Sequence, residues 1–438
     1  MKTDLIIIGS GPGGYRAAEY AAKNGLQVVI AEDKKVGGTC LNEGCIPTKT
    51  LCHEAEVLEV LKTHWAEAAV DFSHLNSRLE EVTGQLRTGV EQLLTMQGIT
   101  LVHGHASFKD AHTIVIGEEE YEADHIIIAT GSHAKMPPIK ELDATMVSTS
   151  TEMLHLDHLP KRLVIVGAGV IGMEFASIFN TFGSEVTVIE FLKECLPSMD
   201  SDIAKRLRKS LEKRGVNFMM QSAVEAITAT GVTYARKGKQ ETIEADTVLI
   251  ATGREPNLQG LNLEAADILA DRKGITVNDN MQTNVQGIYA IGDVNGRMML
   301  AHAATMQGFR AVNHILGKED HIRLDIMPAA VFTHPEAASV GMTEDQAKEQ
   351  GLDFVCKKGF YRSNGKALAM DETEGIIKLL TDSQGHIIGC HVLGAHAADL
   401  VQEIAALMNL DTTIGQLREM VHIHPTLGEI LQNIAEQF

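Results

Sequence analysis

Two stretches of the chain carry the same succession of apolar and polar positions. Each begins with an apolar run, passes through a glycine-rich turn into a segment with helical spacing, and ends with a second apolar run and a glutamate. The stretches are Asp4 to Glu32, DLIIIGSGPGGYRAAEYAAKNGLQVVIAE, and Arg162 to Glu190, RLVIVGAGVIGMEFASIFNTFGSEVTVIE. The repeat predicts two strand–helix–strand units and therefore an α/β chain with more than one domain.

Further elements are predicted between the two units. Apolar positions between residues 46 and 96 recur at helical spacing, which indicates two long helices. Alternation at Ile114–Ile116 and Tyr121–Ala123 predicts a pair of strands, followed by a buried strand at Ile126–Ile128. The polar run Ser148–Thr151 is typical of a crossing between domains.

The pattern changes again near the end of the chain. From about Pro328 the glycine-turn rhythm gives way to strands such as Gly375–Leu380 and Ile387–Gly389, and then to helices. This change indicates a further domain at the C-terminus.

Composition excludes some classes of function. The chain has 38 Lys and Arg against 58 Asp and Glu, a formal net charge of −20, which repels nucleic acid. No apolar run reaches the roughly 18 residues that a membrane span needs, so no membrane association is expected. Gly9 and Gly11 follow the first apolar run too soon for a signal-peptide core, and we expect a cytoplasmic protein.

The glycine turns of the two repeats indicate dinucleotide binding. They are formed by Gly9, Gly11 and Gly14 and by Gly167, Gly169 and Gly172. Glycines at this spacing, between a strand and a helix, let a pyrophosphate approach backbone N–H groups at the helix N-terminus. Glu32 and Glu190 are expected to accept hydrogen bonds from ribose hydroxyls, and a carboxylate at Glu190 favours NAD over NADP because it repels a 2′-phosphate.

Two cysteines lie five positions apart in the segment GGTCLNEGCIPTK, just ahead of a predicted helix. We expect Pro47 at the first helical position, which would place Cys45 at the positive end of the helix dipole, where a thiolate is stabilised. Cys40 and Cys45 could pair as a redox disulfide; a zinc half-site or two packed thiols are the alternatives. The remaining cysteines are scattered, which favours redox chemistry, and no metal site is expected.

Further residues are candidates for the same site. Lys49 follows Cys45 by one helical turn, whereas Glu174, just after the second glycine turn, is explained on the residues alone by the helix dipole. Near the C-terminus, the segment His422-Ile423-His424-Pro425 precedes Glu429, so one histidine and this acid could form a base and its orienting carboxylate.

Six motifs, in this order, resemble those of the class I pyridine nucleotide-disulfide oxidoreductases. They are GGTCLNEGCIPTK, GAGVIGMEF, ATGREPN, TNVQGIYAIGD, LAHAATMQG and HIHPTLGE, and the resemblance spans nearly the whole chain. Within this family the cysteine motif, Glu190 and the HxHPT ending are most similar to the branch that oxidises dihydrolipoamide with NAD. Glu43, between the cysteines, stands where a small apolar residue is commoner.

The resemblance implies FAD at the first glycine turn and NAD at the second. It implies that Asp293 bonds the ribityl chain of the flavin and that Ala301 begins a helix directed at the flavin. The turn Ala129-Thr130-Gly131 recurs at Ala251-Thr252-Gly253. By the same resemblance Thr130 and Gly131 belong to the FAD site and Gly253 to the NAD site.

The resemblance also implies a homodimer in which His424 and Glu429 complete the active site of the other subunit. It implies that Lys49 and Glu174 pair beside the flavin, which reverses the helix-dipole explanation of Glu174.

The expected fold has two Rossmann-like dinucleotide-binding domains and a C-terminal α+β dimerisation domain. We expect the FAD-binding domain at 1–147 and 271–322, the NAD-binding domain at 148–270, and the dimerisation domain at 323–438.

The expected reaction is oxidation of protein-bound dihydrolipoamide through Cys40 and Cys45. The expected partners are the lipoyl domains of 2-oxo acid dehydrogenase or glycine cleavage complexes. A glutathione-type or mercuric reductase and a non-catalytic FAD- and NAD-binding redox sensor are the alternatives.

Overall fold

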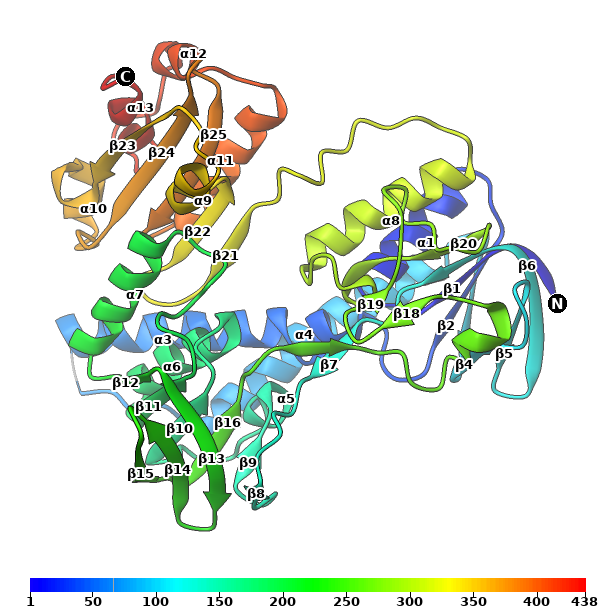
Figure 1. Cartoon of the computed structure of the whole chain (residues 1–438), viewed down its shortest axis with the longest axis horizontal. Coiled ribbons are helices and arrows are strands. Elements are labelled where there is room, and N and C mark those ends of the chain that lie inside the picture. Colours follow the sequence, from blue (N-terminus) through cyan, green and yellow to red (C-terminus); the bar gives the residue numbers. More distant parts are fainter. Residues whose placement is uncertain (66) are drawn as a thin grey trace.

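The computed structural model describes residues 1–65 and 67–438. Three units are visible in Figure 1: the first repeat and the N-terminus on the right, the second repeat at the lower left, and the C-terminal part of the chain at the upper left. The fold is mixed α/β throughout, as the repeat predicted.

The first unit is built on a seven-stranded sheet with the order β3-β2-β1-β6-β5-β4, to which β20 is added along β6. Its strands are β1 (Lys2–Ile8), β2 (Val28–Glu32), β3 (Ile99–His103), β4 (Ala106–Phe108), β5 (Thr113–Ile116), β6 (Glu119–Ile128) and β20 (Ile288–Ala290). β1 is parallel to β2 and β6, and β20 is parallel to β6, whereas β4 and β5 pair antiparallel. A distant segment of the chain therefore completes the first sheet.

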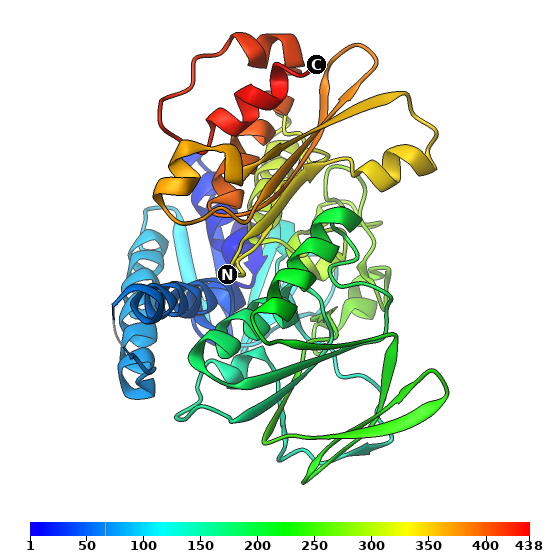
Figure 2. The same cartoon turned by 90° about the vertical axis from the view of Figure 1, so that its left-hand side faces the viewer.

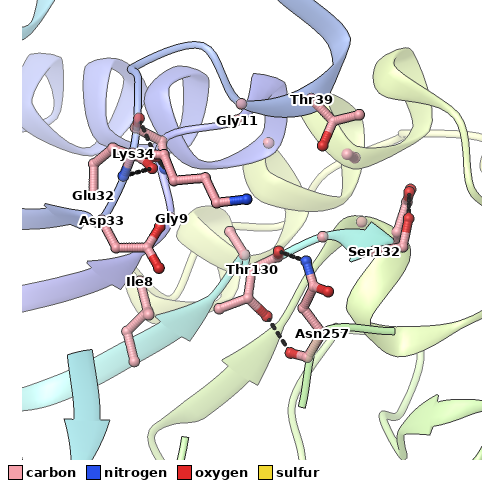
Figure 3. A pocket seen from close by; sticks show the side chains of 18 of the residues that line it. Ile8, Gly9, Gly11, Glu32, Asp33, Lys34, Thr39, Thr130, Ser132 and Asn257 are labelled. Atoms are coloured by element: carbon pink, nitrogen blue, oxygen red, sulfur yellow. Dashed lines mark hydrogen bonds between the residues drawn. The ribbon is translucent and has the colours of Figure 1, made fainter. Parts of the chain in front are cut away.

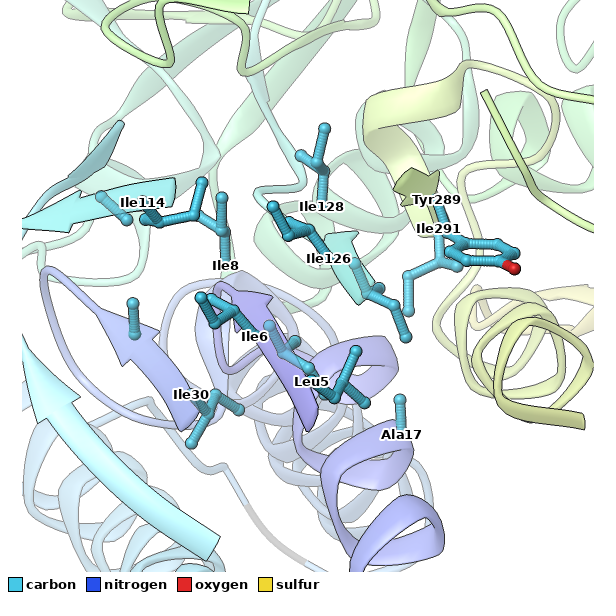
Figure 4. Close-up of a cluster of buried hydrophobic side chains, with 14 of the residues drawn as sticks. Leu5, Ile6, Ile8, Ala17, Ile30, Ile114, Ile126, Ile128, Tyr289 and Ile291 are labelled. Atoms are coloured by element: carbon cyan, nitrogen blue, oxygen red, sulfur yellow. The ribbon is translucent and has the colours of Figure 1, made fainter. Parts of the chain in front are cut away.

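Apolar strands make this sheet the centre of a continuous core. Leu5, Ile6, Ile30 and Ile126 are buried in it together with Tyr289 of β20 (Figure 4). Two helices, α1 (Pro12–Lys23) and α8 (Ala301–Ile315), pack against each other on this core. Strands buried on both faces explain why the sequence reads as apolar runs here rather than as strict alternation.

Three helices follow the first β-α-β unit: α2 (Gly38–Asn42), α3 (Cys45–His64) and α4 (Phe72–Leu94). The prediction of two long helices between residues 46 and 96 is confirmed by α3 and α4. The expected start at Pro47 is wrong: the Gly44 carbonyl accepts the first helical bond, from Thr48 N at 3.0 Å, so Cys45 is the first helical residue.

The second unit has a five-stranded parallel sheet with the order β12-β11-β10-β16-β9. Its strands are β9 (Val147–Ser148), β10 (Arg162–Val166), β11 (Glu185–Glu190), β12 (Asn217–Met220) and β16 (Thr247–Ile250). Its helices are α5 (Ser150–Met153), α6 (Val170–Phe182) and α7 (Ser201–Lys213). A smaller sheet beside it contains β8 (Glu141–Leu142), β13 (Ser222–Thr228), β14 (Gly231–Arg236) and β15 (Lys239–Glu244).

The chain enters and leaves the second unit through two paired segments. They are the antiparallel strands β7 (Ser132–Ala134) and β17 (Arg254–Pro256), each directly after an Ala-Thr-Gly turn. The return segment then forms η1 (Leu263–Ala266), β18 (Ala270–Asp271), β19 (Gly274–Ile275) and, after β20, η2 (Gly292–Asn295). Because the strands run antiparallel, the two Ala-Thr-Gly turns lie at opposite ends of this pair: Asn257 N donates to the Gly131 carbonyl, and Lys135 N donates to the Gly253 carbonyl.

The C-terminal unit is an antiparallel five-stranded sheet with helices. Its sheet has the order β21-β22-β25-β24-β23. Its strands are β21 (Ala329–Val331), β22 (Ala337–Gly341), β23 (Phe354–Phe360), β24 (Ile376–Asp382) and β25 (Ile387–Leu393). Its helices are α9 (Glu344–Glu349), η3 (Tyr361–Ser363), α10 (Gly365–Ala369), α11 (Ala397–Asn409), α12 (Ile414–Glu419) and α13 (Glu429–Ala435).

Helix α7 joins the second unit to the C-terminal unit, and both views show it between them (Figures 1 and 2). Lys378 of β24, only 1% exposed, contacts both oxygens of Asp200 at 2.7 Å and Glu344 at 2.8 Å. Asp200 also caps α7 by accepting from the backbone N–H groups of Asp202 and Ile203. The buried ammonium of Lys378, paired with Asp200, therefore connects the C-terminal unit to the second unit.

No helix of the described residues is both long and apolar enough to cross a membrane.

Candidate active site

The first glycine turn joins β1 to α1 and leaves no room for a side chain at Gly9 or Gly14. Gly9 has φ +101°, a left-handed conformation that favours glycine, and a Cβ on Gly14 would lie 1.9 Å from the Gly9 carbonyl oxygen. Glu32, at the end of β2, accepts hydrogen bonds from Ser10 N at 2.9 Å and Lys34 N at 2.9 Å. The acid is thus held beside the turn by backbone donors, as Figure 3 shows.

The second glycine turn reproduces this arrangement. Gly167 has φ +109°, and a Cβ on Gly172 would lie 2.0 Å from the Gly167 carbonyl oxygen. Glu190 accepts hydrogen bonds from Ala168 N at 2.6 Å and Leu192 N at 2.7 Å. Gly169 is the N-cap of α6, as Gly11 is of α1. Both turns therefore present a helix N-terminus and an oriented carboxylate, the two features that a dinucleotide requires.

A cleft of about 880 Å³ opens beside the first turn (Figure 3). Eight of the predicted FAD-site and cysteine residues line it: Gly9, Gly11, Glu32, Cys40, Thr130, Gly131, Asp293 and Ala301. Gly14 lies beneath the turn rather than on the cleft wall. The volume, the bare glycine turn and the anchored acid fit FAD.

Of the two cysteines, Cys40 lines the cleft and Cys45 does not. Cys40 is part of α2 and Cys45 is the first residue of α3, and both are present as thiols. The Cys40 thiol, by hydrogen bonding, and the Lys49 charge lower the pKa of Cys45 to about 7 against the cost of burial, while the same pairing and burial raise the pKa of Cys40. Near neutral pH Cys45 is therefore in part a thiolate, whereas Cys40 stays a neutral thiol.

Lys49 and Glu174 form a tight ion pair between α3 and α6. The Lys49 ammonium lies 2.8 Å from both carboxylate oxygens of Glu174, which is only 3% exposed. Phe332 N also donates to Glu174, at 2.9 Å, and the Phe332 ring lies 4.7 Å from the ammonium. Burial works against the Lys49 charge, but the nearby carboxylate outweighs it and the pKa of Lys49 is raised.

His424 and Glu429 form a second pair, at the far end of the chain. His424 Nδ1 lies 2.8 Å from Glu429 Oε1, and Glu429 Oε2 accepts from Thr426 N at 2.8 Å. These contacts lower the pKa of Glu429, Thr426 N first and His424 second, so Glu429 stays ionised and holds the imidazole. The His424 side chain is 82% exposed on the C-terminal unit, and none of its hydrogen bonds in the described chain reaches the cysteines.

His422, the other histidine of this segment, faces inward. Its side chain is 9% exposed and its Nε2 lies 3.0 Å from Glu403. The structure thus separates the two histidines that spacing alone left equivalent: His422 is structural, and His424 is the one that a second molecule can reach.

Three residues of the site were not assigned from sequence. Asn257 accepts a hydrogen bond from Thr130 Oγ1 through its carbonyl and donates to the Thr130 carbonyl (Figure 3). Arg254 donates to Ser132, and Ser132 donates to Asp293. The signal for Arg254 and Asn257 was present, because both lie in the ATGREPN motif; Ser132 carries no such signal.

Sequence models of two families match the chain. Residues 3–308 match the pyridine nucleotide-disulphide oxidoreductase family, and residues 327–435 match the dimerisation domain of the same family.

Curated relatives extend over almost the whole chain. The chain is 38% identical to a leghemoglobin reductase of Glycine max, with 99% of this chain and 87% of the relative covered. It is 38% identical to the mitochondrial dihydrolipoyl dehydrogenase of Pisum sativum, with 99% and 91% covered. It is 39% identical to the dihydrolipoyl dehydrogenase of Bacillus subtilis, with 98% and 96% covered.

Solved structures agree over the same length. LpdA of Mycobacterium tuberculosis has a TM-score of 0.92 at 28% identity, with 99% of each chain covered. The flavoprotein disulfide reductase RclA of Escherichia coli, in a Cu(II) complex, has a TM-score of 0.90 at 31% identity, with 100% of this chain and 99% of the other covered.

Proposed function

Since the chain belongs to the pyridine nucleotide-disulphide oxidoreductase family, we propose that it is a dihydrolipoyl dehydrogenase, which oxidises dihydrolipoamide and reduces NAD. The observation that carries this is the thiol pair: Cys40 lies on the wall of a cleft that fits FAD, and its partner Cys45, at the start of α3, has a pKa of about 7. FAD and NAD are the cofactors of this enzyme. Bound FAD supplies the chemistry that carries two electrons from the dithiol to NAD.

The reaction at the cysteines is an exchange of sulfur–sulfur bonds. In the oxidised protein a substrate thiolate attacks Sγ of Cys40, so that a mixed disulfide forms and Cys45 leaves as a thiolate. The second substrate thiol then attacks its own mixed-disulfide sulfur, which releases the cyclic disulfide product and returns Cys40 as a thiol. A leaving group of low pKa speeds the first step, and Cys45 has the lower pKa of the pair.

We propose that Lys49 keeps a positive charge beside Cys45 and that Glu174 fixes the position of this charge. Lys49 lies one helical turn beyond Cys45 and lowers the pKa of its thiol. The double contact from Glu174 orients the ammonium, which would otherwise sample many side-chain rotamers.

A base is needed because the substrate thiols are mostly protonated at neutral pH. We propose His424 of the partner subunit for this role, oriented by Glu429. The exposure of His424 and of its neighbours Val421, at 97%, and Ile423, at 78%, supports a homodimer in which a second copy covers this loop. The match of residues 327–435 to the dimerisation domain supports the same assembly.

The finer assignments form part of the proposal. FAD would be held by Gly9, Gly11, Gly14, Glu32, Thr130, Gly131, Asp293 and Ala301, with Lys49 beside it, and NAD by Gly167, Gly169, Gly172, Glu190 and Gly253. The return of β20 to the first sheet supports an FAD-binding domain at 1–147 and 271–322, around an NAD-binding domain at 148–270, with the dimerisation domain at 323–438. Partners would be lipoyl domains of 2-oxo acid dehydrogenase or glycine cleavage complexes, in the cytoplasm.

Turnover of several substrates side by side tests the proposal. The FAD-loaded protein is assayed for NADH formation with dihydrolipoamide, and for NAD(P)H oxidation with oxidised glutathione and with mercuric ion. We expect activity with dihydrolipoamide and NAD to exceed the others by orders of magnitude, to be lost in Cys45→Ser, and to persist in Cys52→Ser, which changes a buried thiol of the same helix. A dimer that binds both cofactors but turns over none of these substrates would overturn the proposal in favour of a redox sensor.

A further inference from the structure

A chain of three side chains leads from the second unit into the wall of the FAD cleft. Arg254 Nε donates to Ser132 Oγ at 2.7 Å, and a second guanidinium nitrogen donates to the Ser132 carbonyl at 2.6 Å. Ser132 Oγ in turn lies 2.5 Å from Asp293 Oδ2. Ser132 and Asp293 both line the cleft, whereas Arg254, with a side chain 19% exposed, does not. Arg254 Nε also lies 3.8 Å from the same Asp293 oxygen, beyond hydrogen-bond distance.

The chemistry of the three groups fixes the direction of every hydrogen bond. A guanidinium can only donate, so the Ser132 oxygen must accept from Arg254. The single hydroxyl proton of Ser132 is then left for Asp293, whose Oδ2 accepts it. Asp293 Oδ1 has no protein hydrogen-bond partner in the part of the chain that the structure describes, so this oxygen is available to a hydroxyl donor in the cleft.

The negatively charged groups near Arg254 belong to the redox site and the cleft beside it. Burial lowers the pKa of Arg254, and the negative groups that oppose this effect are Asp293, Cys45 and Glu43. Arg254 itself is the first residue of β17, by which the chain returns from the second unit, and β17 pairs with the β7 strand that begins at Ser132. The β7–β17 pair, which joins the two nucleotide-binding repeats, thus positions the guanidinium.

We propose that Arg254 is a positioning residue for the flavin cofactor: acting through Ser132, it fixes Asp293 so that Oδ1 accepts a hydrogen bond from a polyol hydroxyl of FAD. This inference rests on the proposed function in one respect, that FAD is the ligand of the cleft. Arg254 belongs to β17, the strand that leaves the second unit. The position of β17 therefore affects the geometry of the FAD site through these hydrogen bonds.

Binding of FAD to the cofactor-free protein tests the relay without any turnover. The dissociation constant is measured by flavin fluorescence for wild type, Arg254→Met, Arg254→Lys, Ser132→Ala and the double variant Arg254→Met with Ser132→Ala. Arg162→Met is the matched control, because it removes an arginine with two carboxylate contacts, Glu244 and Asp246, on the surface of the second unit.

We expect Arg254→Met and Ser132→Ala each to weaken FAD binding about tenfold or more, since each loses a hydrogen bond linked to a charged group. If Arg254 acts through Ser132, the double variant is weaker than Ser132→Ala by no more than about twofold. Arg254→Lys, which can restore one donor, regains part of the lost affinity, and Arg162→Met binds as wild type does.

A purely structural role for Arg254 would give a different result. It would lower the thermal unfolding midpoint of the cofactor-free protein in Arg254→Met, and the losses of FAD affinity in the two single variants would add. Additive losses, or FAD affinity within about twofold of wild type in both single variants, overturn the relay. A wild-type protein that binds FAD tightly but does not oxidise dihydrolipoamide would instead overturn the proposed function and leave the relay standing.

Discussion

Lys49 of α3 and Glu174 of α6 lie 125 positions apart in the sequence and form a double hydrogen bond, with both carboxylate oxygens 2.8 Å from the ammonium. The pair joins the helix that begins at Cys45 to the helix that follows the second glycine turn. The positive charge beside the redox thiolate is therefore held by a residue of the second nucleotide-binding repeat.

Replacing Lys49 by Met should raise the pKa of Cys45, because the Lys49 charge is one of the groups that lower it to about 7. A thiolate titration followed by ultraviolet absorbance in the reduced protein should show its midpoint move up by about one unit or more. Lys62→Met is the control: Lys62 lies on the same helix but bonds the Thr181 carbonyl, and its loss should leave the midpoint in place. An unchanged midpoint in Lys49→Met would mean that this charge does not act on Cys45.

Replacing His424 by Gln should slow reduction of the enzyme by dihydrolipoamide by about 10² to 10⁴-fold, the usual range for loss of a general base. Reduction of an artificial acceptor by NADH should change little, because that reaction needs no thiol deprotonation. Rapid-mixing measurements of the two half-reactions separate these effects. Equal losses in both half-reactions would argue against the assignment, and His422→Gln shows what a structural histidine of the same segment costs.

Replacing Lys378 by Met should destabilise the protein by about 3–5 kcal/mol, since it leaves Asp200 buried without its partner. The matched variant Lys358→Met breaks a partly exposed pair with Asp202, in the first turn of α7, and should cost less than about 1 kcal/mol. Urea unfolding of the two variants gives the comparison. Similar midpoints for both would show that the buried cluster does not stabilise the contact between the second and C-terminal units.

The same cluster predicts a dependence of stability on pH. Lys348 first, and Lys378 second, lower the pKa of Glu344 from 4.5 to about 2 in the folded protein. The stabilising contribution of Glu344 is therefore present above about pH 4.5 and is lost as the pH falls toward about 2. The stability difference between wild type and Glu344→Gln should shrink across this window, and a difference that grows on acidification would contradict the sign.

Local patterns predicted the nucleotide-binding repeats well, because strand, glycine turn, helix and acid all lie within one continuous segment. The two long helices between residues 46 and 96 followed from periodicity alone. Boundaries were less accurate: α3 begins at Cys45 rather than at Pro47, since a glycine N-cap accepts the first helical bond and nothing in the spacing marks it.

Contacts between distant segments could not be read from spacing. The Lys49–Glu174 pair followed only from the family resemblance, and the Arg254–Ser132–Asp293 relay was not foreseen. Lys378 did leave a signal, a lone charge within the apolar run Ile376–Leu380 that implies a buried partner, but the partner itself, Asp200, comes from another unit.

The central claim is that Cys45 becomes a thiolate next to bound flavin when the enzyme takes electrons from a dithiol. Anaerobic addition of one equivalent of dihydrolipoamide to the FAD-loaded protein measures this directly by absorbance at long wavelength. We predict a broad thiolate-to-flavin band in wild type that is absent in Cys45→Ser. A band of equal strength in Cys45→Ser would contradict the account.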